Sequence, residues 1–186
     1  MIHLKKILNR LIFFTALILF ANYLFTPIYA LFVAKIGGNV ETAGFAYAIY
    51  SISTAILILV MGKWEDHVKH RENLLIAASF LSFVGFSAYL FVGDITQLFL
   101  VQIVLGIATA IAMPAFDSMY SENLDKGKHA SEWSIWESTN YITASFAAAA
   151  GGIIVGTFGF SVLFILMALL SLGALVIAIT LARIKN

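Results

Sequence analysis

The sequence predicts an all-α membrane protein with six transmembrane helices, and both its composition and its hydrophobic runs support this prediction. Of the 186 residues, 61% are hydrophobic and 11% are charged, whereas soluble domains carry about 25% charged residues. A helix needs about 20 apolar residues to cross the hydrocarbon core of a bilayer. Clusters of polar residues divide the sequence into six such segments, at about residues 11–33, 42–62, 73–93, 95–120, 131–156 and 159–182. We expect them to form a single domain, residues 1–186.

The basic residues predict the orientation of these segments. Ten of the eleven lysines and arginines fall in the N-terminal stretch, the second and fourth connections and the C-terminal stretch, and only Lys35 falls on the other side. Since basic residues concentrate in cytoplasmic loops, we expect a multi-pass protein of the cell membrane, in contact with the lipid bilayer and with both termini cytoplasmic. The basic start is also typical of a signal peptide, but the apolar run after it is long enough to cross and five more follow.

Costly polar side chains are concentrated in four of the six segments. Such groups usually face the protein interior or a wet cavity. In the first segment, Asn22, Thr26 and Tyr29 are four and three residues apart, so they share one helical face. The fourth segment has a similar stripe, from Gln102 to Asp117. We therefore predict that segments one, two, four and five line a substrate cavity and that three and six face lipid. The predicted lining residues are Asn22, Thr26, Tyr29, Tyr47, Tyr50, Gln102, Thr109, Asn140 and Tyr141.

For any one hydroxyl or tyrosine taken alone, hydrogen bonding between helices is the favoured role, whereas the bias shared by four segments favours a cavity for the set as a whole. Two acids, Asp117 and Glu137, lie well inside their segments. They are candidates for proton or cation coupling, and the alternative for each is a solvated vestibule.

Other classes of function find little support in the sequence. There is no basic stripe for nucleic-acid binding, and the absence of cysteine excludes disulfides and thiolate metal sites. The four histidines fall in tails or loops and not beside a nucleophile within a segment. We expect no enzymatic activity, no cofactor and no metal site.

The only two prolines, Pro27 and Pro114, occupy similar places in the first and fourth segments. Many transporter folds contain inverted repeats of three helices with interruptions at matching places. The prolines therefore favour a 3+3 inverted repeat with an interrupted helix in each half.

The stretch "GKWEDHVKHREN", residues 62–73, resembles the signature loop of the major facilitator superfamily, Gly-x-x-x-Asp-(Arg/Lys)-x-Gly-(Arg/Lys)-(Arg/Lys). Gly62, Asp66 and Arg71 match, and His70 stands at a basic position. The flanking segments are similar to the first, second and fourth helices of that family, and Glu122 matches the acid that ends the fourth. The resemblance covers nearly the whole chain and implies one six-helix half of the major facilitator fold.

Three features depart from the family pattern. Gln102 replaces an arginine of the fourth helix, which puts the proton-linked role of that arginine in doubt. In "TASFAAAAGG", Ala147 and Ala148 replace the Gly-Pro of the fifth-helix antiporter pattern. Family members usually have twelve helices in two halves, whereas this chain has one half.

The resemblance implies a transporter of small solutes that works by alternating access. Two identical chains in one orientation can reproduce the missing half, so we expect a parallel homodimer or a partnership with a second six-helix half. The alternative is a non-transporting fragment, a degenerate half or an assembly partner of a split transporter. The resemblance also implies a cytoplasmic gate against the fifth helix of the partner, made by Gly62, Asp66, His70, Arg71, Glu122, Ser131 and Glu132.

Overall fold

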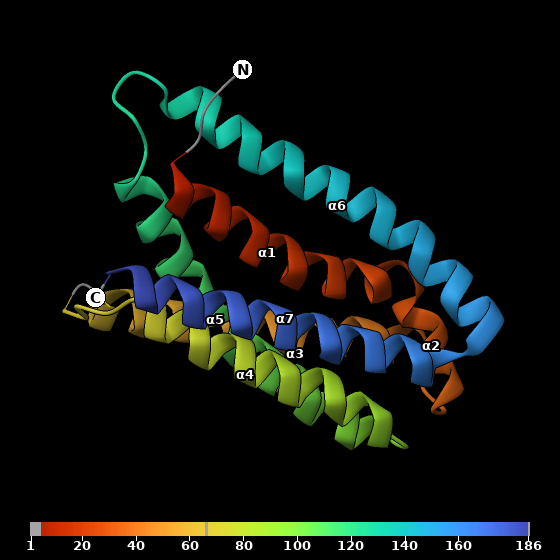
Figure 1. Cartoon of the computed structure of the whole chain (residues 1–186). Coiled ribbons are helices and arrows are strands. Elements are labelled where there is room, and N and C mark those ends of the chain that lie inside the picture. The colour runs from red at the N-terminus through yellow and green to blue at the C-terminus, as the bar shows by residue number, and fades with distance from the viewer. Residues whose placement is uncertain (1–4, 66, 186) are drawn as a thin grey trace.

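The computed structural model describes residues 5–65 and 67–185, and these residues contain six helices long and apolar enough to cross a membrane (Figure 1). No strand occurs in this part of the chain. The elements are α1 (Lys6–Phe25), the short 3₁₀ helix η1 (Thr26–Ile28), α2 (Tyr29–Lys35), α3 (Val40–Glu65), α4 (Glu72–Ala88), the short 3₁₀ helix η2 (Tyr89–Phe91), α5 (Ile95–Glu122), α6 (His129–Phe158) and α7 (Phe160–Lys185).

The first spanning segment is interrupted and the fourth is not. Pro27 lies in η1, between α1 and α2, whereas α5 continues through Pro114. Proline lacks the N–H of a helical hydrogen bond, but neighbouring helices can hold such a helix together in a membrane. The expectation of matching interruptions at both prolines is therefore wrong.

The helices form an open arc in the order α6, α1, α7, α4, α5, α3, in which each packs mainly on its neighbours. Helices α4 and α7 occupy the middle of the arc, and α3 and α6 form its two edges (Figure 1). The two edge helices are consequently the least buried of the six spanning segments. The third segment was predicted only to face lipid, but its position between α5 and α7 buries one of its faces.

Two glycines allow the edge helices to approach closely. A Cβ on Gly151 would lie 1.9 Å from the carbonyl oxygen of Leu24, and a Cβ on Gly106 would lie 2.9 Å from that of Tyr50. The hydroxyl of Thr54 also donates a hydrogen bond to the carbonyl of Gly106, at 3.2 Å. Small residues permit such contacts between membrane helices. The stretch of small residues in α6, "TASFAAAAGG", therefore packs at Gly151 against α1 of the same chain.

Helices α6 and α7 are joined by a single residue, Gly159, with φ of 81°. A residue with a side chain is strained at this φ. The chain therefore reverses direction across the membrane with almost no connection between the two helices.

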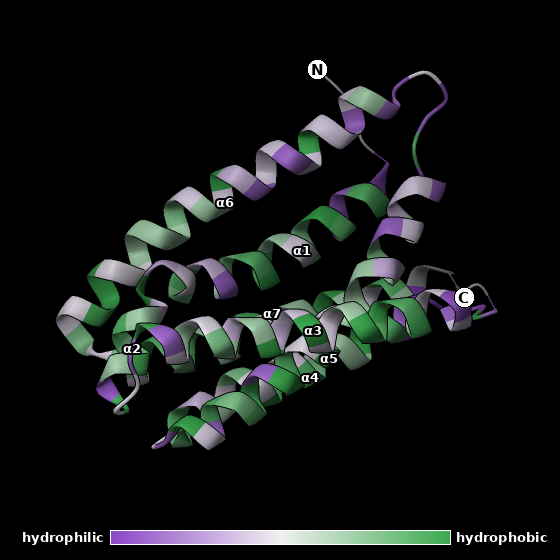
Figure 2. Ribbon diagram, turned by 180° about the vertical axis from the view of Figure 1, so that it is seen from behind, coloured by the Kyte–Doolittle hydropathy of each residue, from purple (hydrophilic) through white to green (hydrophobic). Residues whose placement is uncertain are grey.

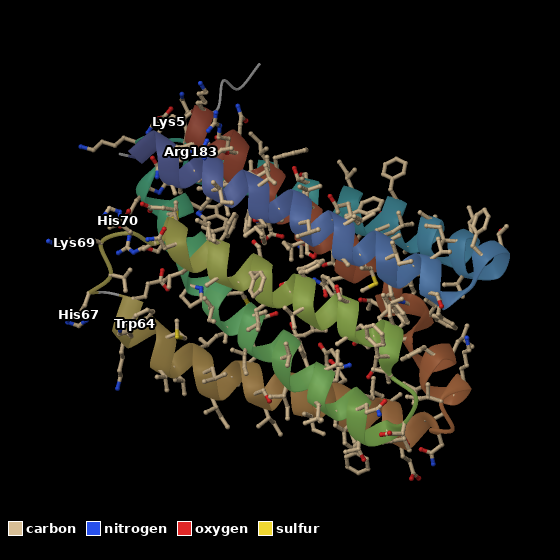
Figure 3. All side chains as sticks on the ribbon, turned by 60° about the horizontal axis from the view of Figure 1, so that its bottom comes forward. Lys5, Trp64, His67, Lys69, His70 and Arg183 are labelled. Carbon is tan, nitrogen blue, oxygen red and sulfur yellow. The ribbon has the colours of Figure 1, made fainter. Side chains whose placement is uncertain are left out.

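The start of α1 and the end of α7 lie at the same end of the bundle. Figure 1 shows the start of α1, the end of α7 and the connections α3–α4 and α5–α6 gathered there, and we call this the terminal end. Figure 3 places Lys5, Lys69, His70 and Arg183 at this end. Hydrophilic residues concentrate there, while hydrophobic residues cover most of the length of the helices (Figure 2).

Candidate functional site

A cavity of about 510 Å³ opens inside the arc. Most of its wall comes from α1 and α5, which make few direct contacts with each other. Residues of α3 and α4 form much of the rest of the wall, and α6 and α7 contribute Trp136 and Met167. Several lining side chains, including those of Asn22, Tyr47 and Asp117, are also solvent-exposed. The cavity of a single chain is therefore open along one side.

Seven of the nine predicted substrate residues line this cavity. They are Asn22, Thr26, Tyr29, Tyr47, Tyr50, Gln102 and Thr109. They come together because their spacing places them on the cavity-facing side of each helix. Gly106, part of the same stripe in α5, packs instead on the backbone of α3.

The other two, Asn140 and Tyr141, lie on α6 outside the cavity lining. Asn140 accepts a hydrogen bond from the hydroxyl of Tyr23, at 3.0 Å, and Tyr23 lines the cavity. Tyr141 is 71% exposed. Helix α6 lies at the edge of the arc and packs mainly on α1, and its contribution to the cavity lining is Trp136.

Hydrogen bonds tie the cavity wall together at mid-bundle and towards the end remote from the termini. The amide nitrogen of Gln102 donates to the hydroxyl oxygen of Tyr29, at 2.6 Å, and to that of Tyr89, at 3.3 Å. The hydroxyls of Tyr50 and Thr109 are hydrogen-bonded at 3.0 Å. Gln102, which stands where the family pattern has an arginine, thus connects three elements without bringing a positive charge into the cavity. The same side chains therefore line the cavity and form hydrogen bonds between helices.

The sequence prediction missed the part of the wall that α4 supplies. Ala78, Ser79, Ser82 and Phe86 line the cavity from this helix, followed by Tyr89. A signal was available, because Ser79, Ser82 and Phe86 are three and four residues apart and share one helical face. Tyr23 and Trp136 were also missed as lining residues.

The two acids predicted for coupling are separated by the structure. Asp117 lines the cavity near the terminal end, whereas Glu137 lies exposed on α6 outside the lining. Among the described residues that line the cavity, Asp117 alone carries a formal charge.

The predicted gate residues fall into two groups at the terminal end. In the first, the guanidinium of Arg71 pairs with Glu122 and lies 3.9 Å from the carboxylate of Glu65. The imidazole of His70 contacts the carboxylate of Glu72 at 3.0 Å. The buried acids Glu65 and Glu72, which are 3% and 1% exposed, were not singled out in the sequence.

Gly62 lies near the end of α3 with open space around the position of a Cβ, and Asp66 lies outside the described residues.

The second group organises the α5–α6 connection. Glu132 is fully buried and its carboxylate accepts a hydrogen bond from the backbone N–H of Asp125, at 2.9 Å. The hydroxyl of Ser131 donates to the carbonyl of Lys128, at 2.9 Å. Within one chain, these contacts hold Ser131 and Glu132, in the first turn of α6, against the α5–α6 connection.

The start of α1 is attached to the same connection. The ammonium group of Lys5 lies 3.0 Å from the carboxylate of Asp125 and donates to the carbonyl of Asn123, at 2.8 Å. Lys128 also contacts Asp125, at 3.1 Å. Hydrogen bonds from Lys5 and Lys128 lower the pKa of Asp125 below its ordinary value of 3.8.

Two comparisons with known proteins agree with this architecture. The family described as Major Facilitator Superfamily matches residues 11–186. The chain is 27% identical over 155 residues to the uncharacterized MFS-type transporter YitZ of Bacillus subtilis (strain 168), across 78% of this chain and 88% of YitZ. Together with the six spanning helices, these matches support a multi-pass membrane transporter and not an enzyme. The chain belongs to the Major Facilitator Superfamily.

Proposed function

We propose that the chain is a half-size transporter subunit that moves small solutes by alternating access as a parallel homodimer. The observation that carries this proposal is the cavity with polar lining that a single chain leaves open on one side. A second copy related by a two-fold axis along the membrane normal would supply the missing wall. A second six-helix half of different sequence would fill the same place.

The edges of the arc support a specific pairing. A two-fold axis through the open side brings α3 of each chain beside α6 of its partner, so this contact forms twice. Both helices have large exposed apolar side chains, among them Ile52, Leu59, Ile142 and Phe146. Contiguous exposed apolar surface of this kind is typical of interfaces as well as of lipid-facing helices.

We further propose that the terminal end is cytoplasmic and carries the gate. In the dimer, Gly62 at the end of α3 and the following loop, with Asp66, His70 and Arg71, would meet the N-terminus of the partner's α6, near Ser131 and Glu132. A helix N-terminus favours a carboxylate by about 0.3–1 kcal/mol. The pair of Arg71 and Glu122 would hold the loop in place for this contact.

Side-specific labelling of single cysteines tests the proposal, and the chain has no cysteine of its own. Purified Asn22→Cys and Tyr50→Cys proteins would be reconstituted into liposomes and treated with a membrane-impermeant maleimide from either side. Alternating access predicts that both cavity positions react from each side. Phe80, exposed on the face of α4 away from the cavity, gives the control Phe80→Cys, which should react from neither side.

Equal protection of the cavity positions and of Phe80→Cys would refute the cavity as a transport path. Reaction from one side alone would favour the alternative of a non-transporting assembly partner.

A further inference from the structure

We propose that the cavity binds lipophilic organic cations, with the carboxylate of Asp117 as their counter-charge. This inference rests on the proposed function for its transport step and names the substrate class of the same cavity. Three observations support it: the charge of the lining, the freedom of that charge, and the aromatic surfaces around it.

The lining has one sign of charge. Of the described residues that form it, Asp117 is the only acid, and none is lysine, arginine or histidine. A two-fold dimer would place two such acids in one cavity. A charge in the membrane interior is costly unless it is paired or hydrated. The carboxylate would repel an anionic substrate, whereas a bound cation would pair with it and lower the free-energy cost of its charge in the membrane interior.

Asp117 is also free to accept a partner. Its side chain is exposed towards the cavity and forms no hydrogen bond or ion pair with any other described residue. The acids Glu65, Glu122 and Glu132, by contrast, are engaged in contacts at the terminal end. The carboxylate in the cavity is thus available to pair with a bound molecule.

Aromatic rings provide the remaining attraction. Phe116 and Trp136, which line the cavity at the level of Asp117, have ring centroids 5.7 Å apart. Tyr47 and Tyr50 of α3 form a second pair, at 6.0 Å. Ring faces attract cations and bury apolar substituents. A volume of about 510 Å³ falls in the range of pockets for drug-sized molecules.

A pair of ions with nearly the same shape tests this inference on the unaltered protein. Binding of radiolabelled tetraphenylphosphonium, a monocation, would be measured by equilibrium dialysis in detergent at a fixed lipid content. Binding of radiolabelled tetraphenylborate, the matching anion, would be measured in separate samples, because the two ions form a poorly soluble salt when mixed. We expect saturable binding of the cation and at least about tenfold weaker binding of the anion.

Substitutions then locate the counter-charge. Asp117→Asn should weaken cation binding at least about tenfold, as expected for loss of a charge-assisted contact, and Asp117→Glu should retain it. Glu41→Gln removes a carboxylate from the remote end of α3 and should leave the affinity within about twofold. Each variant would first be checked for a single symmetric peak in size-exclusion chromatography.

Equal affinity for the two ions would overturn the inference whether or not any variant folds. Loss of binding in Glu137→Gln but not in Asp117→Asn would overturn the assignment to Asp117. The labelling experiment keeps the two proposals apart: cation selectivity with one-sided labelling would leave the substrate class standing and remove transport. Labelling from both sides without cation selectivity would support transport and remove the substrate class.

Discussion

At the scale of single residues, the two adjacent glycines of α6 have different surroundings. A Cβ on Gly151 would collide with the backbone of Leu24, whereas a Cβ on Gly152 meets nothing within 4 Å. Gly151→Ala should therefore push α6 away from α1 and destabilise the protein by about 1–3 kcal/mol. Gly152→Ala, the matched control, should be neutral or stabilising by up to about 1 kcal/mol. Thermal unfolding in detergent, followed by size-exclusion chromatography, distinguishes them, and equal midpoints would contradict the close contact.

At this scale, most of the polar residues that line the cavity could be predicted from the sequence. Regular spacing identified the stripes from Asn22 to Tyr29 and from Gln102 to Asp117, because helical geometry fixes which side chains share a face. It could not place Asn140, because the position of this residue depends on the packing of α6 against α1. It also could not find the hydrogen bond from Tyr23 to Asn140, which depends on two helices far apart in the sequence.

At the scale of elements, the link between α1 and the α5–α6 connection should respond to pH. Hydrogen bonds from Lys5 and Lys128 lower the pKa of Asp125. A group with a lowered pKa stabilises the folded state above its ordinary pKa, here 3.8, and this contribution disappears as the pH falls through the lower folded value. The link should therefore persist at every pH from neutral down to about 3.8.

Lys5→Ala should raise the pKa of Asp125, and Lys6→Ala, one residue further on, should not. The pKa can be measured from the carboxyl ¹³C shift of labelled aspartate in nanodiscs. An unchanged pKa in Lys5→Ala would show that this contact does not form in the bilayer.

At the scale of elements, the composition of the third segment, α4, did not predict how this helix is buried. Its polar groups are small, so the sequence predicted a lipid-facing helix, yet Ser79 and Ser82 face the cavity. The burial of a helix depends on its neighbours as much as on its own residues, and α4 lies between two of them. Hydropathy identified the helix but not its place in the arc.

At the scale of the whole molecule, the proposed dimer predicts a pattern of cross-links. Ile52 of α3 and Ile142 of α6 are both exposed and lie thirteen residues from Glu65 and His129, the helix ends nearest the termini. Both are thus at a depth of about 20 Å. Ile52→Cys and Ile142→Cys chains carrying different tags should form a mixed product with a short bifunctional thiol reagent.

Each variant alone should cross-link less than the mixture, because the two-fold axis pairs unlike helices. Val176→Cys, on the exposed face of α7, is the control and should pair with neither. Equal yields from all combinations would indicate random collision and contradict the proposed interface.

Length and charge were sufficient to predict the number of spans and the gathering of basic residues at one end, since both follow from the bilayer itself. The order of helices around the arc was not accessible in the same way. It depends on contacts such as Gly151 with Leu24 and Gly106 with Tyr50, which join segments distant in the sequence.

The open side of the cavity has a further consequence for the life of the protein in the cell. A newly inserted chain without a partner presents Asn22, Tyr47 and Asp117 to the surrounding lipid, where polar groups are poorly accommodated. In the proposed dimer, pairing would remove this exposure, so folding stability and association would be linked by mass action. Diluting the protein in lipid should therefore lower its stability, and its survival against membrane proteases should rise with its own density in the bilayer.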